Sequence, residues 1–455
     1  MFKTVRNAWA IPELRKKILF TIFALLIFRL GSSIPVPWID TKGLQDYLNA
    51  MSGSIFGLIN AMSGNAFAMA TVFALGVQPY INSSIIIQLL TVAIPALERM
   101  QKEGGEEGRK KIAAITRYTT VGIALLQGFG YFTLINANGL ISGDLPTWLA
   151  GIIIVLSFTA GSAFVMWLGE QITEFGIGNG ISVILFAGIV SRFPSMVQGM
   201  VTGVQRWAMH LSDSEISAMG TTQGEAFRNS LVHPAMIPLI VIGVLALVVF
   251  IVFINDSERR IPVQYAKRVV GRKMYGGQSS HIPMKVNMSG VMPIIFAQAI
   301  ASLPATIAAF IPGGMDSTFM KVFDSNGLVY AIVYFLLILG FSYFYATMQF
   351  NPIEVANNLK KNGGFVPGFR PGKPTADFIH KVLGKITLFG AIYLAIIALL
   401  PIITANIINL ASGSQMGRSL SIGGTSIIIV VGVALETVKA LEAQMLMRHY
   451  KGFLE

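Results

Sequence analysis

Long apolar stretches separated by short polar segments run along almost the whole chain. A helix that crosses a bilayer needs about 20 apolar residues, and ten stretches have this length, roughly at 18–38, 71–94, 113–136, 148–168, 178–198, 235–254, 290–312, 328–350, 384–405 and 423–440. Only 12% of the residues are charged, against about 25% in a soluble domain. The pattern therefore predicts an all-α polytopic membrane protein. No clear cleavage pattern follows the first stretch, so we expect it to be retained as a span.

Basic residues fall mainly on one side of the predicted membrane. With the N-terminus inside, and with cations at span ends counted in the adjoining segment, the inside segments hold 27 Lys and Arg and the outside segments hold 6, while Arg29 lies within the first span. Cytoplasmic segments of membrane proteins carry such an excess of positive charge. The count predicts that both termini are cytoplasmic, and one span more or fewer would scramble every later loop.

The segment 47–97 contains no Asp, Glu, Lys or Arg in 51 residues. It is too long for one span, yet the charge pattern allows only an odd number of crossings. We expect one span near 71–94, interrupted by Gly76 and Pro79, and one half-inserted helix at 54–65. Irregular backbone at membrane depth is tolerated only within protein or along a cavity. The segment is therefore predicted to line and close a central cavity, with an interfacial loop as the alternative for 54–65.

Several motifs carry a resemblance to a known family. They are Phe73-Ala-Leu-Gly-Val-Gln-Pro-Tyr-Ile-Asn-Ser-Ser-Ile-Ile-Ile-Gln-Leu-Leu-Thr91, Gly-Glu-Gln-Ile-Thr-Glu at 169–174 followed by Gly-Ile-Gly-Asn-Gly-Ile-Ser at 176–182, the Pro-rich segment 33–40 and the segment 421–431. In these motifs the chain resembles the SecY/Sec61-alpha family, the channel subunits of the Sec protein translocon. The resemblance extends along nearly the whole sequence.

The resemblance implies ten transmembrane helices in two inverted five-helix halves around a central pore, with a re-entrant plug half-helix. Inverted halves place their functional site near the midplane, where they meet. The expected parts are an N-terminal half at 1–199 with the plug at about 54–65, an external hinge loop at 200–234, a C-terminal half at 235–441 with cytoplasmic loops at about 255–289 and 351–385, and a cytoplasmic tail at 442–455.

The resemblance also assigns candidate site residues. A narrow apolar constriction suits a pore that must leak few ions, and the expected pore ring is Val77, Ile81, Ile181, Leu185, Ile295 and Ile429. Aliphatic residues in spans commonly pack or face lipid, which is the alternative for each. The expected plug is Ser54, Ile55, Phe56, Gly57, Leu58, Ile59, Asn60, Ala61, Met62, Ser63, Gly64 and Asn65. A lateral gate formed by spans 2, 3, 7 and 8 would carry polar positions at Gln88 and Asn287, for which ordinary interhelical hydrogen bonding is the alternative.

The two long basic loops favour docking of a soluble partner. The resemblance implies the SecA ATPase or the ribosome as that partner, with contacts at Arg259, Arg260, Lys267, Arg268 and Arg370. It also implies SecE and SecG as neighbouring subunits and signal-peptide-bearing precursor proteins as the transported chains. The alternative is that these cations only set topology and meet anionic membrane lipid.

The sequence offers no catalytic constellation. It has no Cys, its five His fall in predicted loops and tails, and the Gly-rich segments at 104–111 and 368–373 lack phosphate-loop spacing. We therefore expect neither enzymatic activity nor a cofactor. The expected function is a pore-forming subunit in the bacterial plasma membrane, which translocates unfolded secretory proteins and releases hydrophobic segments laterally into lipid. The alternative is a multispan secondary transporter of an uncharged small solute.

Overall fold

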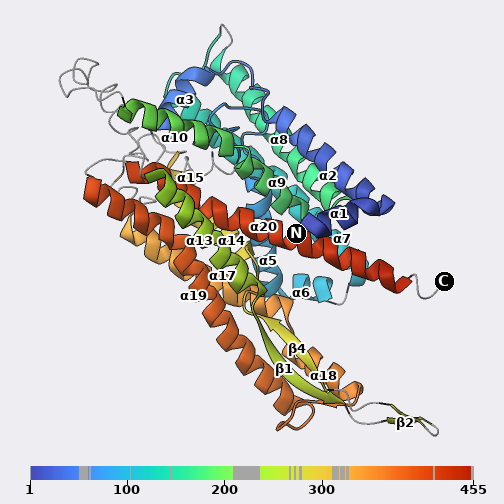
Figure 1. Cartoon of the computed structure of the whole chain (residues 1–455). Helices are drawn as coiled ribbons and strands as arrows, with labels where there is room; N and C mark the ends of the chain where they lie inside the picture. Colours follow the sequence, from blue (N-terminus) through green and yellow to red (C-terminus); the bar gives the residue numbers. More distant parts are fainter. Residues whose placement is uncertain are drawn as a thin grey trace.

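The computed structural model describes residues 2–50, 60, 63–102, 104–143, 146–208, 236–265, 268–270, 273–275, 279–309, 317, 323, 327–412 and 416–451. Within these ranges the chain is mostly helical, and two groups of helices lie side by side (Figure 1). The first group is α1 (Phe2–Ala10), α2 (Pro12–Gly31), α3 (Thr41–Ala50), α7 (Gly105–Ala137), α8 (Thr147–Phe175), α9 (Gly180–Val190) and α10 (Phe193–Ala208). The second group is α13 (Met236–Asp256), α14 (Met292–Ala301), α15 (Leu303–Ala309), α17 (Leu328–Gln349) and α19 (Lys373–Ser412).

Two elements connect these groups. Helix α20 (Met416–Lys451) runs between them and contacts α9 and α1 on one side and α13 and α19 on the other (Figure 1). Helix α5 (Gln78–Ala93) packs on α7 and α8 of the first group and on α14 of the second. The chain then bends by 104° into α6 (Pro95–Lys102). The interior of the molecule is therefore shared by elements from both ends of the sequence.

Membrane-spanning character is clear for part of the chain. Four described helical segments are long and apolar enough to cross a bilayer, namely Gly105–Ala137, Thr147–Phe175, Leu328–Lys361 and Lys373–Leu400, and the bent pair α5 and α6 would make a fifth. Shorter apolar helices cover Gly180–Ser195, Val241–Asp256 and Met292–Ala301. The chain is thus a protein with several apolar spans, and the count of ten stays a prediction.

The predicted second span is helical over only its second half. Helix α5 begins at Gln78, because Pro79 in its first turn needs no hydrogen-bond partner for its nitrogen. Before it the chain turns repeatedly and stays largely buried, with positive φ angles of 44° at Ala70 and 53° at Gly76. The stretch 63–77 is therefore irregular backbone enclosed by protein, as the sequence led us to expect for a cavity lining.

Strands replace the loop predicted at 255–289. Strand β1 (Glu258–Tyr265) pairs antiparallel with β4 (Ser279–Lys285) and, at its far end, with β5 (Gly364–Phe365), while β2 (Arg268–Val270) pairs with β3 (Lys273–Tyr275). Ile261 and Val263 alternate with exposed residues along β1, which is the period-two pattern of a strand with one buried face. The fold is therefore mostly helical rather than all-α.

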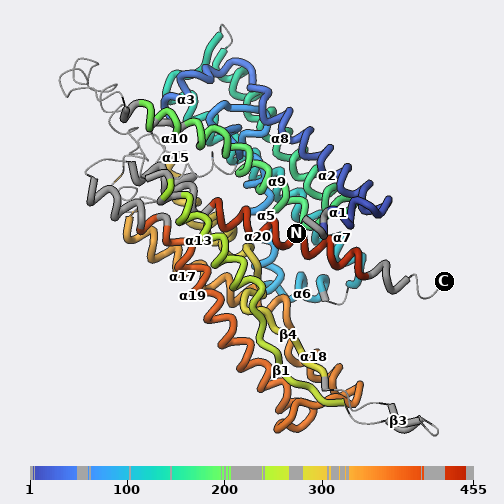
Figure 2. Tube along the Cα trace, viewed as in Figure 1, coloured from blue at the N-terminus to red at the C-terminus, as the bar shows by residue number. Residues whose placement is uncertain are grey.

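The two predicted loops form one body, which we call the arm: β1, β4, β5, α18 (Pro352–Lys361) and the beginning of α19. Its own apolar core contains side chains from both loops, Ile261, Val263, Met284, Leu359, Val366, Ile379 and Leu383. The arm extends away from both helix groups at one end of the molecule (Figure 2). A force applied to either loop is consequently transmitted to the other.

Candidate functional site

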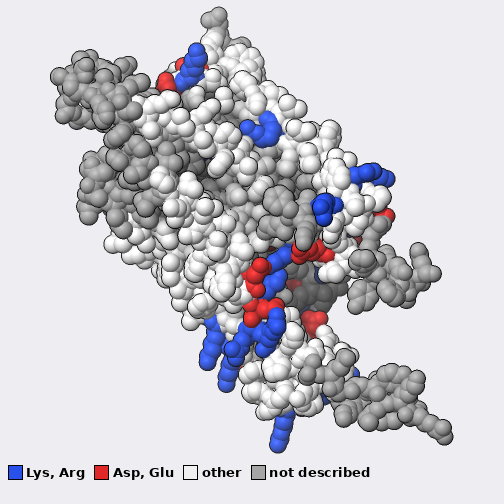
Figure 3. All heavy atoms as spheres, in the orientation of Figure 1, with Lys and Arg blue, Asp and Glu red and all other residues white. Residues whose placement is uncertain are grey.

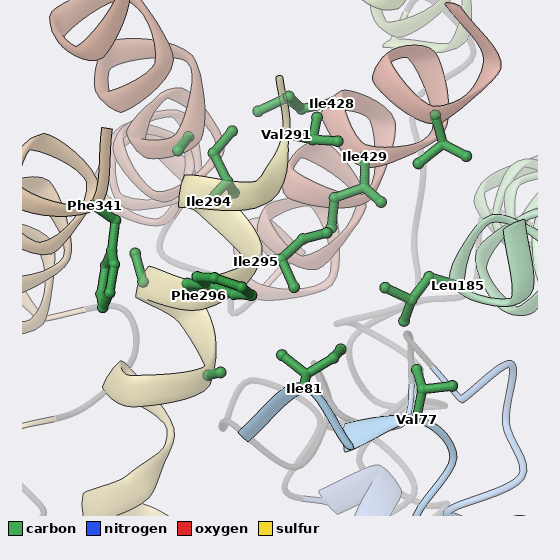
Figure 4. Close-up of a cluster of buried hydrophobic side chains, with 14 of the residues drawn as sticks. Val77, Ile81, Leu185, Val291, Ile294, Ile295, Phe296, Phe341, Ile428 and Ile429 are labelled. Carbon is green, nitrogen blue, oxygen red and sulfur yellow. The ribbon is translucent and has the colours of Figure 1, made fainter. Parts of the chain in front are cut away.

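The six predicted ring residues meet in the largest apolar cluster of the molecule. Five of them, Val77, Ile81, Leu185, Ile295 and Ile429, are buried, and Ile181 packs against them. Figure 4 shows the five buried side chains directed toward one another from α5, α9, α14, α20 and the turn before α5. The structure thus brings together residues spread over more than 350 positions of sequence.

The cluster separates two hollows of unequal size. A hollow of ≈ 400 Å³ has Ile81, Ile181, Leu185 and Ile295 on its floor and wall. Val77 and Leu185 also border a second hollow, which measures only ≈ 10 Å³. Leu185 borders both hollows, so the predicted ring residues adjoin a wide space and a much smaller one.

Charged and polar groups also line the wide hollow. The Arg117 Nε donates to Glu170 Oε1 at 2.8 Å across α7 and α8, and Glu174 and Thr173 belong to the same lining. None of these residues is among the predicted site residues. Their signal was available, since Glu170 and Glu174 are one turn apart in a family motif and so share a helix face. The lining of the hollow therefore combines charged and polar groups with aliphatic side chains.

The Gly-Ile-Gly-Asn-Gly turn places α9 beside the hollow. Gly178 has a φ of +73°, and Asn179 caps α9 because its Oδ1 accepts the N–H groups of Ile181 and Ser182. A Cβ on Gly180 would lie 1.9 Å from the backbone oxygen of Gly169 in α8. Gly178 therefore permits a tight turn, and Gly180 permits close contact between α9 and α8. These two features set the position of Ile181 and Leu185, the predicted ring residues of α9.

The predicted plug lies only partly within the described residues. Asn60, Ser63, Gly64 and Asn65 are described, whereas Ser54–Ile59, Ala61 and Met62 lie outside the described ranges. The Asn60 Nδ2 donates to Asn65 Oδ1 at 3.0 Å, and the Phe67 N–H donates to Ser63 Oγ at 3.1 Å. Ser63 borders the narrow hollow opposite Val77. The described end of the segment is thus ordered by its own hydrogen bonds directly beside the ring.

A second anchor of this segment comes from the neighbouring helices. The Tyr131 hydroxyl donates to the backbone oxygen of Phe67, and the two rings stack. Gly64 lies against the end of α9, where Arg29 Nη1 donates to Ser191 Oγ at 3.0 Å. Arg29 lies within the first predicted span, and in the fold it bonds to a polar group of an adjacent helix.

The two predicted gate residues have separate partners. Gln88 Oε1 accepts the hydroxyl of Tyr345 at 3.1 Å, and this bond crosses from α5 to α17. Asn287 Nδ2 instead donates to Asn255 Oδ1 at 2.8 Å, at the end of α13. Tyr345 was missed because one Tyr within the aromatic run Tyr343–Tyr345 has no distinguishing spacing. The bond of Gln88 therefore joins the connecting helix α5 to the second helix group, whereas that of Asn287 joins the loop before α14 to α13.

The predicted docking residues belong to the arm. Arg259 and Arg260 are exposed on β1, where Arg260 Nε lies 2.7 Å from Glu258 Oε1, and Arg370 is exposed between β5 and α19. Lys267 and the side chain of Arg268 lie outside what the structure describes. Lys and Arg also gather where the arm leaves the helical body (Figure 3). Among the described residues, no group of three or more His, Asp or Glu is placed to hold a metal ion.

Comparisons with known proteins agree with one family. The SecY family model matches residues 71–438. Proteins named "Protein translocase subunit SecY" from Streptomyces coelicolor and Bacillus subtilis are each 42% identical to this chain over the full length of both sequences. A solved structure described as "The structure of a protein conducting channel" has a TM-score of 0.60 at 17% identity and covers 95% of this chain and 92% of that one. The family model and the full-length relatives show that the chain belongs to the SecY family.

Proposed function

We propose that the chain is the pore-forming subunit of a protein-conducting channel. It translocates unfolded secretory proteins across the membrane and releases hydrophobic segments sideways into lipid. The observation that carries this proposal is the convergence of aliphatic side chains in one apolar cluster, beside a hollow that charged and polar groups also line. A narrow apolar ring resists ions by excluding water, yet its flexible side chains part for a polypeptide.

The proposed architecture has ten spans in two inverted halves, 1–199 and 235–441, linked by the loop 200–234. The irregular, enclosed backbone of 63–77 supports a re-entrant plug at 54–65 that closes the pore beside Val77. Opening of the lateral gate would separate α5 from α14 and α17, which breaks the Gln88–Tyr345 hydrogen bond. Asn287 would hold the loop before α14 to the end of α13 through its hydrogen bond to Asn255.

The proposed setting is the plasma membrane of a bacterium, with both termini in the cytoplasm. The exposed arginines of the arm would receive the SecA ATPase or the ribosome, and the family's SecE and SecG would join the channel within lipid. Full-length likeness to proteins named as translocase subunits supports this setting, and one fold relative is described as Sec61 in a canine ribosome–channel complex. No enzymatic step or cofactor is required, because the partner supplies the energy.

A transporter for an uncharged small solute is not favoured. Such a carrier selects its ligand with polar groups at the midplane, whereas aliphatic side chains from several helices converge here. The wide hollow opens onto the ring instead of enclosing a site of its own.

Site-directed crosslinking tests the proposed pore. The chain contains no cysteine, so Ile81→Cys introduces a single thiol, and a stalled secretory precursor carries another. We expect a precursor-dependent disulfide in membranes supplied with SecA and ATP. Ile396→Cys is the matched control, because Ile396 is 55% exposed on α19. If a verified stalled precursor reaches neither Ile81 nor the other ring positions, the pore is elsewhere.

A further inference from the structure

The loop that joins the arm to α14 is held at its first residues by α13. The Val286 N–H donates to the backbone oxygen of Ser257 at 3.0 Å, and Asn287 Nδ2 donates to Asn255 Oδ1 at 2.8 Å. Both partners lie at the end of α13 or just beyond it. The base of the arm is therefore fastened to the helix that leads into β1.

The last residues of the same loop are held by Glu436 of α20. Gly290 has a φ of +62°, and a Cβ there would lie 2.2 Å from Glu436 Oε1, so the carboxylate lies directly on the loop backbone. Val291 precedes the first residue of α14 and makes no side-chain cap of its own. The negative charge of Glu436 therefore lies beside the N-terminus of α14, where it interacts favourably with the helix dipole.

Successive turns of α20 extend this contact. One turn before Glu436, Gly432 leaves room for the Val291 side chain, since a Cβ there would lie 2.4 Å from Val291 Cγ1. Three residues after Glu436, the Lys439 Nζ lies 2.6 Å from Asp256 Oδ1 at the end of α13. The base of α14, the end of α13 and α20 therefore meet around one carboxylate, beside a hollow of ≈ 280 Å³.

Two ring residues depend on this junction. Ile295 follows Val291 by four residues, about one helical turn, and Ile429 precedes Glu436 by seven, about two turns. A displacement of the arm that pulls the loop off Glu436 would move Ile295 relative to Ile429.

We propose that Glu436 is a positioning residue of the gate, which holds α14 and its Ile295 against α20 until the arm is displaced. The idea rests on the proposed pore function. It explains how displacement of the arm would move Ile295 relative to Ile429, although the arm itself carries no ring residue. Glu436 does not touch the transported chain; it acts through the base of α14.

The test measures resting ion conductance in planar bilayers that contain the reconstituted full chain with its partner subunits, together with precursor transport in vesicles from the same preparation. Loss of the carboxylate and its charge beside the N-terminus of α14 should raise the resting open fraction, and hence the conductance, about fivefold in Glu436→Ala. Glu436→Gln keeps an acceptor oxygen and should fall between that variant and the parent. Glu442→Gln is the matched control, because Glu442 lies two turns further along α20 and accepts from Thr4 Oγ1 instead.

A double-mutant cycle separates positioning from general damage. Gly290→Ala should also raise conductance, but by less in the Glu436→Ala background, since the atom that its Cβ strikes is then absent. Gly363→Ala has the same strain with φ +69° and nothing within 4 Å, so it should leave conductance unchanged. Independent effects of Gly290→Ala and Glu436→Ala, or a parental conductance in both Glu436 variants, would overturn the proposal. Failure of the parental protein to transport a precursor would instead overturn the proposed function.

Discussion

Replacing Tyr345 by Phe removes one hydroxyl from the seam between α5 and α17 and leaves the aromatic ring in place. The lost interaction is the 3.1 Å hydrogen bond to Gln88 Oε1, which joins the connecting helix α5 to α17 of the second helix group. Hydrogen bonds between membrane helices contribute about 0.6 to 1–2 kcal/mol. Both residues line the wide hollow, so water can replace the hydroxyl and the lower part of that range applies. A loss of about 0.6–1 kcal/mol raises the ratio of open to closed seam about three- to fivefold.

Thiol labelling measures that ratio. Ile85 lies one turn before Gln88 on α5 and is 3% exposed, so Ile85→Cys reacts only when the seam opens. In membranes without precursor, Tyr345→Phe should increase its labelling rate by about three- to fivefold. The matched control is Tyr343→Phe, which loses a hydroxyl bond of 3.2 Å to the backbone oxygen of Gly384, within the second helix group. Equal labelling rates in the two variants would refute the assignment of the Gln88–Tyr345 bond to the gate.

Two further substitutions test the packing around the site. Gly180→Ala should prevent α9 from reaching its place on α8 and lower the thermal midpoint, because the new Cβ would lie 1.9 Å from a backbone oxygen; Gly243→Ala, with nothing within 4 Å, should not. If the two variants melt alike, the close contact is not required. Ile261→Asp should unfold the arm by burying an unpaired charge in its core, whereas Ile353→Asp, at a side chain that is 65% exposed, should leave it folded. Limited proteolysis distinguishes these outcomes, and equal resistance would contradict the arm's separate core.

The sequence was most informative where composition and motif dominate. Apolar runs identified α7, α8, α17 and α19 as span-length helices, and the motif match selected six residues, five of which are buried in one apolar cluster. It was least informative about ends and partners. Helix α5 begins seven residues later than its apolar run, because the run continues through buried turns that hydropathy does not distinguish from helix. The strands of the arm were read as loops, since their alternation spans only a few residues.

Hydropathy, charge bias and motifs thus determined the class of the protein, its family and the apolar character of the proposed pore ring, because each of these depends on residue type along a single segment. The tertiary structure alone decided which side chains meet. Tyr345 bonds Gln88 from 257 positions away, and Glu436 lies against Gly290, just before the helix whose first residue is Met292. Local sequence indicates neither pairing, because a contact between distant helices depends on the distance and orientation that packing imposes and not on spacing along the chain.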